Sequence, residues 1–94
     1  MENFDKILIV ELGLRIAALR KERQLTQAEL SDLVDMEESA LRRIELGGTN
    51  PTFKTLIRIA RGLEISLTEL LDISILNPQH EGFNFVWIFG DIAG

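Results

Sequence analysis

The chain has 94 residues, no cysteine, a single histidine and a net charge of -5. A chain of this length forms one domain with a modest core, and the lack of cysteine excludes disulfides and thiolate metal sites, which fits a reducing cytoplasm. The acidic amino-terminal stretch has only a short apolar run, so we expect no secretory signal, no membrane span and a cytoplasmic protein.

Positive charge is concentrated in the middle of the chain. Residues 15–61 hold nine basic and seven acidic side chains and sum to +2. Residues 1–14 sum to -2, and residues 62–94, which contain no Lys or Arg, sum to -5. Binding to nucleic acid depends largely on Lys and Arg, so the middle segment is the part that suits contact with phosphates.

Residues 4–23 are predicted to form a helix. Leu12, Ile16 and Leu19 recur at helical spacing and predict a core-facing stripe. Gly13 costs roughly 1 kcal/mol relative to Ala inside a helix, which leaves open a separate strand or arm at residues 7–10.

Residues 26–47 are predicted to form two short helices joined by a tight turn. Thr26 and Glu29 have the spacing of a capping box at the start of the first helix. Asp35 stands where the chain must bend, and Asp tolerates a left-handed backbone there. The apolar stripe of this first helix is predicted at Leu30, Leu33 and Val34.

The second helix of the pair is predicted over residues 37–46. Glu37 opens this range as a poor N-cap, whereas Gly47 supplies a left-handed stop. At 100° per residue, the side chains of this helix fall on two opposite sides. The inward side holds Ala40, Leu41 and Ile44, and the free side holds Ser39, Arg42, Arg43 and Leu46.

Two further helices are predicted after this pair. Thr52 caps the first, and Ser66 with Glu69 forms a second capping box that opens a short helix ending near Leu71. Arg58 and Arg61 are interpreted as solvated surface residues. The helix that Thr52 caps is predicted to face inward with Phe53, Leu56, Ile57, Ala60 and Leu63.

Residues 77–94 are predicted to be an extension to a domain at residues 1–76. The lone His80 is interpreted as an exposed turn residue rather than a metal ligand or catalytic group. The segment FNFVWIF at residues 83–89 predicts a strand that must pair across the two-fold axis of a dimer, fold back on its own helices, or dock on another protein. Its aromatic face holds Phe83, Phe85, Trp87 and Phe89.

Four motifs between Leu12 and Leu71 resemble one protein family. They are LGLRIAALRKERQLTQAEL, SALRRIELG, NPTFKTLIRIARGLEIS and LTELL, in that order. Together they resemble the Xre-like, phage repressor and Cro class of helix-turn-helix regulators. The resemblance implies an all-α, five-helix DNA-binding domain, here followed by the extension with its predicted strand.

The resemblance also implies roles for individual residues. Arg20 and Glu45 match a buried ion pair that joins the helix at residues 4–23 to the helix at residues 37–46. We call the latter the reading helix. The residues implied to contact base edges are Glu38, Ser39 and Arg43, with Arg42 beside them. The residues implied to contact phosphates are Gln27, Asn50, Thr52 and Lys54.

The start of the reading helix departs from the family pattern. Glu37 stands where the family usually has Ser or Thr, and a second acid follows at Glu38. Two carboxylates suit the helix dipole but repel phosphates. Either Glu38 reads the N4 donor of a cytosine, or the helix has lost affinity for DNA.

The sequence therefore predicts a DNA-binding transcriptional regulator that reads an inverted repeat as a homodimer. One alternative is an antitoxin with the same fold that also grips a toxin through its apolar tail. The other is an interaction module that no longer binds DNA. We expect no enzymatic activity, no cofactor and no metal, because no nucleophile with a base, phosphate-cradling glycine loop or ligand cluster is present.

Overall fold

The computed structural model describes residues 2–73, and the predicted strand at residues 83–89 lies outside them. The described chain forms five helices and no strand, so the all-α, five-helix prediction is confirmed. None of these helices is long and apolar enough to cross a membrane. The helices are α1 (Glu2–Glu22), α2 (Gln27–Leu33), α3 (Glu38–Glu45), α4 (Phe53–Gly62) and α5 (Leu67–Leu70).

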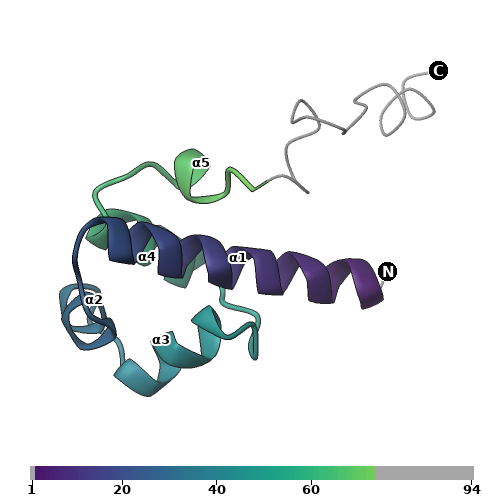
Figure 1. The fold of residues 1–94 in the computed structure, drawn as a ribbon, viewed down its shortest axis with the longest axis horizontal. Helices are drawn as coiled ribbons and strands as arrows, with labels where there is room; N and C mark the ends of the chain where they lie inside the picture. The colour runs from purple at the N-terminus through teal and green to yellow at the C-terminus, as the bar shows by residue number, and fades with distance from the viewer. Residues whose placement is uncertain (1, 74–94) are drawn as a thin grey trace.

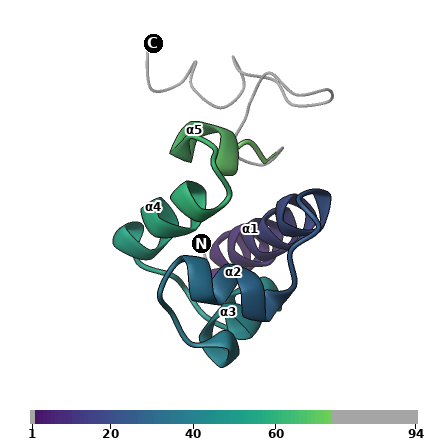
Figure 2. The ribbon, with the colours of Figure 1, turned by 90° about the vertical axis from the view of Figure 1, so that its left-hand side faces the viewer.

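The longest helix, α1, runs along the long axis of the molecule (Figure 1). In that view α3 lies below it, α5 above it and α4 behind it, while α2 closes one end. The end-on view shows α1 and α4 side by side above the α2–α3 pair (Figure 2). Helix α3 packs on both α1 and α2, so its orientation depends on two neighbours.

Helix α1 is continuous, which excludes the separate strand or arm at residues 7–10. Leu12, Ile16 and Leu19 are buried, as their spacing predicts. They join a single core with apolar residues from the other four helices and the turns after them. The further members are Leu30, Val34, Leu41, Ile44, Ile59, Ala60, Leu63 and Leu70.

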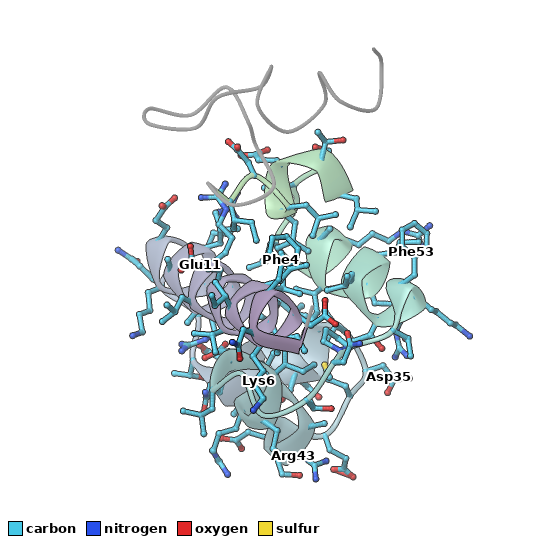
Figure 3. The ribbon with its side chains drawn as sticks, turned by 90° about the vertical axis from the view of Figure 1, so that its right-hand side faces the viewer. Phe4, Lys6, Glu11, Asp35, Arg43 and Phe53 are labelled. Atoms are coloured by element: carbon cyan, nitrogen blue, oxygen red, sulfur yellow. The ribbon has the colours of Figure 1, made fainter. Side chains whose placement is uncertain are left out.

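Two residues predicted to face the core are exposed instead. Leu33 is 62 % exposed and Phe53 is 65 % exposed. Leu33 ends α2 one position before Val34, and the pair Leu30 and Val34, four residues apart, already covers the inner side. Phe53 is the first residue of α4, where a side chain leans towards the helix amino terminus and away from the core (Figure 3).

Left-handed residues occupy the turns that end four helices. Asp35 at φ 57° and Gly47 at φ 75° were predicted from the sequence. Gln24 at φ 58° and Glu64 at φ 60° end α1 and α4 in the same way. They were missed because neither residue type is enriched at positive φ.

Candidate nucleic-acid interface

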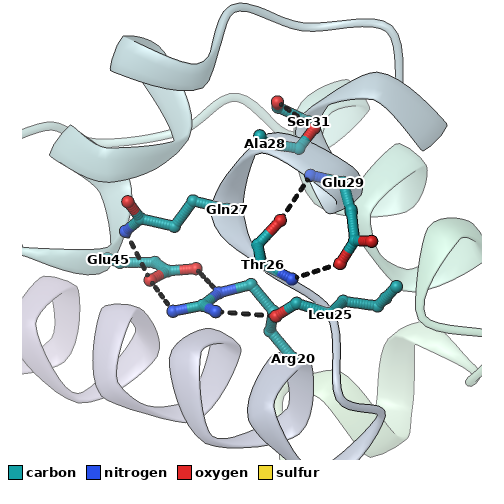
Figure 4. A network of polar contacts seen from close by, with 8 residues as sticks. All are labelled: Arg20, Leu25, Thr26, Gln27, Ala28, Glu29, Ser31 and Glu45. Carbon is teal, nitrogen blue, oxygen red and sulfur yellow. Dashed lines mark hydrogen bonds and ion pairs between the residues drawn. The ribbon is translucent and has the colours of Figure 1, made fainter.

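A buried ion pair joins α1 to the end of α3. The sequence predicts a pair between Arg20 and Glu45, and these two side chains form it (Figure 4). Arg20 Nε lies 2.7 Å from Glu45 Oε2, and Arg20 Nη2 lies 2.9 Å from Oε1. Both residues are only 8 % exposed. The side-chain hydrogen bond to Glu45 raises the pKa of Arg20, against the desolvation that lowers it, so the guanidinium stays charged.

Two more contacts join this pair to the turn before α2 and to the first residue of α2. Arg20 Nη1 donates to the carbonyl oxygen of Leu25 at 2.8 Å, and Gln27 Nε2 donates to Glu45 Oε1 at 2.9 Å (Figure 4). The network therefore connects the end of α1, the start of α2 and the end of α3. This fixes the angle at which α3 leaves the scaffold, because buried charges that are fully hydrogen-bonded tolerate little displacement.

The start of α2 is capped as its sequence predicts. Glu29 N donates to Thr26 Oγ1 at 3.0 Å, and Thr26 N donates to Glu29 Oε1 at 2.8 Å. These two bonds satisfy two amides that a helix start otherwise leaves without a partner. At the start of α5, Ser66 Oγ accepts a hydrogen bond from Glu69 N at 3.0 Å, which is one of the two bonds of the predicted second capping box.

Arg58 was interpreted as a solvated surface residue; its side chain is 39 % exposed, but it also makes two contacts that the sequence did not indicate. Its Nη2 donates to the carbonyl oxygens of Val34 and Asp35, both at 2.6 Å. Val34 and Asp35 lie at the end of α2 and in the turn before α3. Carbonyl groups at the end of a helix have no amide partner within the helix. Arg58 therefore attaches α4 to the turn of the helix-turn-helix unit.

Helix α3 has one buried and one exposed side. Leu41, Ile44 and Glu45 face inward and are buried. On the other side Ser39, Arg42 and Arg43 are exposed, as their helical positions predict. Figure 3 shows Arg43 at the outer edge of the molecule, pointing away from the other helices.

The two arginines on this side differ in their contacts. Arg42 Nη2 lies 3.3 Å from Glu38 Oε2, one helical turn earlier, and both side chains are about half exposed. Arg43 forms no ion pair within residues 2–73. Of the two guanidinium groups, that of Arg43 is the one available without breaking a contact. Glu37 forms no side-chain cap, as predicted for this residue type.

The residues predicted to contact phosphates occupy two places. Asn50, Thr52 and Lys54 are exposed in the loop after α3 and the first turn of α4. Thr52 Oγ1 accepts a hydrogen bond from Thr55 N at 3.1 Å, so its hydroxyl also caps α4. Gln27 is half-buried at the start of α2, and its amide nitrogen retains a second N–H beyond the one donated to Glu45.

Three contacts of the unit were missed from sequence. They are the bond from Gln27 to Glu45, the bonds from Arg58 to the turn, and a 2.9 Å bond from Arg15 Nη2 to the carbonyl of Glu69. Each joins residues 18 to 54 positions apart in the chain. No local pattern marks such pairs, because side-chain donors of this kind occur on most helices.

Comparison with known proteins identifies the unit. A family model described as helix-turn-helix matches residues 16–70, which include the ion pair, the turn and all of α3. The chain belongs to this helix-turn-helix family. The resemblance predicted from the four sequence motifs is thereby confirmed.

The relatives of this helix-turn-helix chain are named as regulators. The immunity repressor protein of Bacillus phage phi105 is 38 % identical over 70 residues, which are 74 % of this chain and 49 % of that protein. The transcriptional repressor RstR of the cryptic phage CTXphi, from Vibrio cholerae, is 38 % identical over 56 residues, or 60 % of this chain and 50 % of that protein. The chain thus spans about half the length of these relatives.

A solved structure shares the fold. The restriction-modification controller protein C.AhdI from Aeromonas hydrophila superimposes with a TM-score of 0.65 at 29 % identity. The match covers 66 % of this chain and 94 % of that one. The named proteins are repressors and a controller rather than enzymes, in agreement with the function class predicted from the sequence.

Proposed function

We propose that this helix-turn-helix protein is a DNA-binding transcriptional regulator that inserts α3 into the major groove. One observation carries the proposal: Ser39, Arg42 and Arg43 are exposed on the side of α3 opposite its buried Leu41 and Ile44. A helix of this kind fits the major groove, where base edges present a distinct pattern of donors and acceptors.

Arg43 is the proposed base-reading residue. Its guanidinium has two parallel donors that match O6 and N7 of guanine, and no protein group within residues 2–73 forms an ion pair with it. Ser39 lies one helical turn before Arg43, Glu38 directly precedes Ser39, and both are exposed. They are proposed to contact neighbouring bases, with Arg42 joining them if its bond to Glu38 opens.

Contacts with the phosphate backbone are proposed on both sides of α3. Gln27 lies at the start of α2, where the helix dipole favours an anion, and Asn50, Thr52 and Lys54 follow α3. These residues would position the protein without reading sequence. They belong to the segment 15–61, whose net charge is +2 within a chain of net charge -5.

We propose that two copies bind one inverted repeat in the cytoplasm, with their α3 helices in successive major grooves about 34 Å apart. A single α3 of eight residues reads only a few base pairs, and a second copy doubles the site.

Selection of bound sites from random DNA duplexes tests the proposal. We expect a preferred duplex with two-fold symmetry. Light scattering of the complex should give the mass of one duplex and two protein chains. Titration of the binding with salt then gives the number of phosphates engaged. A search that recovers no preferred sequence would contradict the proposal, and a preferred site without symmetry would contradict only the dimer.

An interaction module that no longer binds DNA is the second candidate. Its support is the acidic start of α3, where Glu37 and Glu38 are both exposed and Glu38 engages Arg42. Failure to bind any duplex, even at low salt, would favour it. The antitoxin alternative depends on the tail beyond residue 73 and stays a prediction, which co-purification of a toxin with the full chain would support.

A further inference from the structure

The amino-terminal half of α1 carries large apolar side chains that the rest of the described chain leaves about half exposed. No residue from 3 to 11 is buried, although five of these nine positions are Phe, Ile, Leu or Val. In Figure 1 this half of α1 extends beyond α3, with no other helix in front of it. Apolar residues in this half therefore face solvent on more than one side.

Three of these exposed residues share one side of α1. Ile7, Val10 and Leu14 are 51 %, 45 % and 57 % exposed, and we call them the α1 stripe. At 100° per residue they fall within about 60° of one another, on the side opposite the buried Leu12 and Ile16. A helix that is apolar on two opposite sides is normally buried on both. The α1 stripe is thus a surface that needs a cover.

We propose that residues 83–89 of the same chain, FNFVWIF, cover the α1 stripe. Six of these seven residues are apolar, and Gly82 and Gly90 bound the segment. An apolar segment with large side chains at nearly every position has the same need for burial as the stripe. The sequence allows this segment to pair across a dimer axis, to fold back on its own helices or to dock on another protein. The α1 stripe is an apolar surface that suits folding back on its own helices.

The chain is long enough to make this contact. Helix α5 is joined to α1 by the 2.9 Å bond from Arg15 to Glu69, and the described chain ends four residues later at Ile73. Residues 74–82 span up to ~30 Å when extended. Arg15 and Ile7 are separated by only about 12 Å along the axis of α1. Residues 83–89 therefore reach the whole stripe.

Attachment to the same chain favours this contact. It gives the segment an effective concentration of roughly millimolar, which a second copy at micromolar concentration does not reach.

The fluorescence of Trp87 tests this proposal on the full chain, because Trp87 is its only tryptophan. We expect the wild-type emission to be blue-shifted from that of free tryptophan amide, resistant to acrylamide quenching, and unchanged by dilution. Ile7→Glu and Leu14→Glu should shift the emission to the red and raise the quenching towards the free value. Phe53→Glu is the control, an apolar site on α4 that is at least as exposed, and should change neither.

Circular dichroism of each variant checks that the helices remain. Wild-type emission like that of free tryptophan amide would overturn the proposal. So would an unchanged emission in both α1 variants. A blue shift that disappears on dilution, while the mass from light scattering falls from two chains to one, would also overturn the proposal. It would show that a second copy covers the α1 stripe.

Cysteine crosslinking identifies which chain supplies the segment, because the protein has no cysteine of its own. Leu14→Cys is combined in turn with Phe85→Cys, Val86→Cys and Ile88→Cys and oxidised at micromolar protein. We expect a monomeric crosslinked product from at least one combination. Covalent dimers alone, or no product from all three combinations, would overturn the proposal.

Discussion

Gly13 of α1 lies directly against the backbone of Ile44 near the end of α3. A Cβ atom added at Gly13 would overlap the carbonyl oxygen of Ile44 and lie 2.7 Å from that of Glu45. The absence of a side chain thus lets α1 approach the backbone of α3 next to the Arg20–Glu45 pair. This close approach explains a glycine inside a helix, where it otherwise weakens the structure.

Gly13→Ala is expected to destabilise the protein. Overpacking costs about 1 to 3 kcal/mol, and here the atoms in the way are backbone, which yields less than a side chain. The gain in helix propensity is only about 1 kcal/mol. Urea unfolding measures the difference. Gly48→Ala is the control, because an added Cβ there meets its nearest atom at 3.5 Å. A Gly13→Ala protein as stable as the wild type would contradict the close-packing account.

The helices themselves were predictable from local signals, and their mutual contacts were not. The cap at Thr26 and the spacing of Leu12, Ile16 and Leu19 involve neighbours in the chain, so the sequence shows them directly. Gly13 was interpreted as a weak point, because the carbonyls that require it belong to a helix about thirty residues later.

The same distinction applies to individual side chains. Exposure of Leu33 and Phe53 depends on where α2 and α4 end or begin against their neighbours, which periodicity alone does not contain. The exposed side of α3 was predicted correctly for Arg42 and Arg43, since eight residues of helix separate two sides clearly. The Arg20–Glu45 pair was inferred from family resemblance rather than from spacing.

Arg58→Met is expected to loosen the turn between α2 and α3. The change removes both donors to the carbonyls of Val34 and Asp35, while the methionine keeps most of the apolar stem. We expect a loss of about 1 to 2 kcal/mol in urea unfolding, as for hydrogen bonds that involve a charged group near the surface. Arg61→Met, at an exposed position on the same helix, is the control. Equal losses for the two variants would contradict a specific role for Arg58.

The Arg20–Glu45 pair is expected to behave as a unit. Glu45→Leu leaves the Arg20 guanidinium buried without its carboxylate and should cost about 3 to 5 kcal/mol. The double variant Arg20→Met with Glu45→Leu should lose much less than the sum of the two single variants, because neither charge is then left alone. Urea unfolding of all four proteins gives the coupling. Strictly additive losses would show that the two side chains contribute independently.

Arg43→Ala tests base reading by α3. If Arg43 grips a guanine, the variant should lose about 1 to 3 kcal/mol of binding to the selected duplex and relax the preference at one base pair. Its stability should change little, because the side chain is exposed. Lys54→Ala is the comparison, with an equal loss on every duplex and a salt slope reduced by about 1. Equal losses on all sequences for both variants would contradict base reading by Arg43.

Glu38→Gln distinguishes the two interpretations of the acidic start of α3. The exposed pair with Arg42, at 3.3 Å, contributes only about 0.3 to 0.5 kcal/mol, so stability should barely change. If Glu38 only repels phosphates and restrains Arg42, the variant should bind all duplexes more tightly, with a steeper dependence on salt. If Glu38 accepts a hydrogen bond from cytosine N4, the variant should lose discrimination at one base pair instead. We expect the second result in a protein that reads sequence, and binding curves on the selected duplex and its single-base variants separate the two.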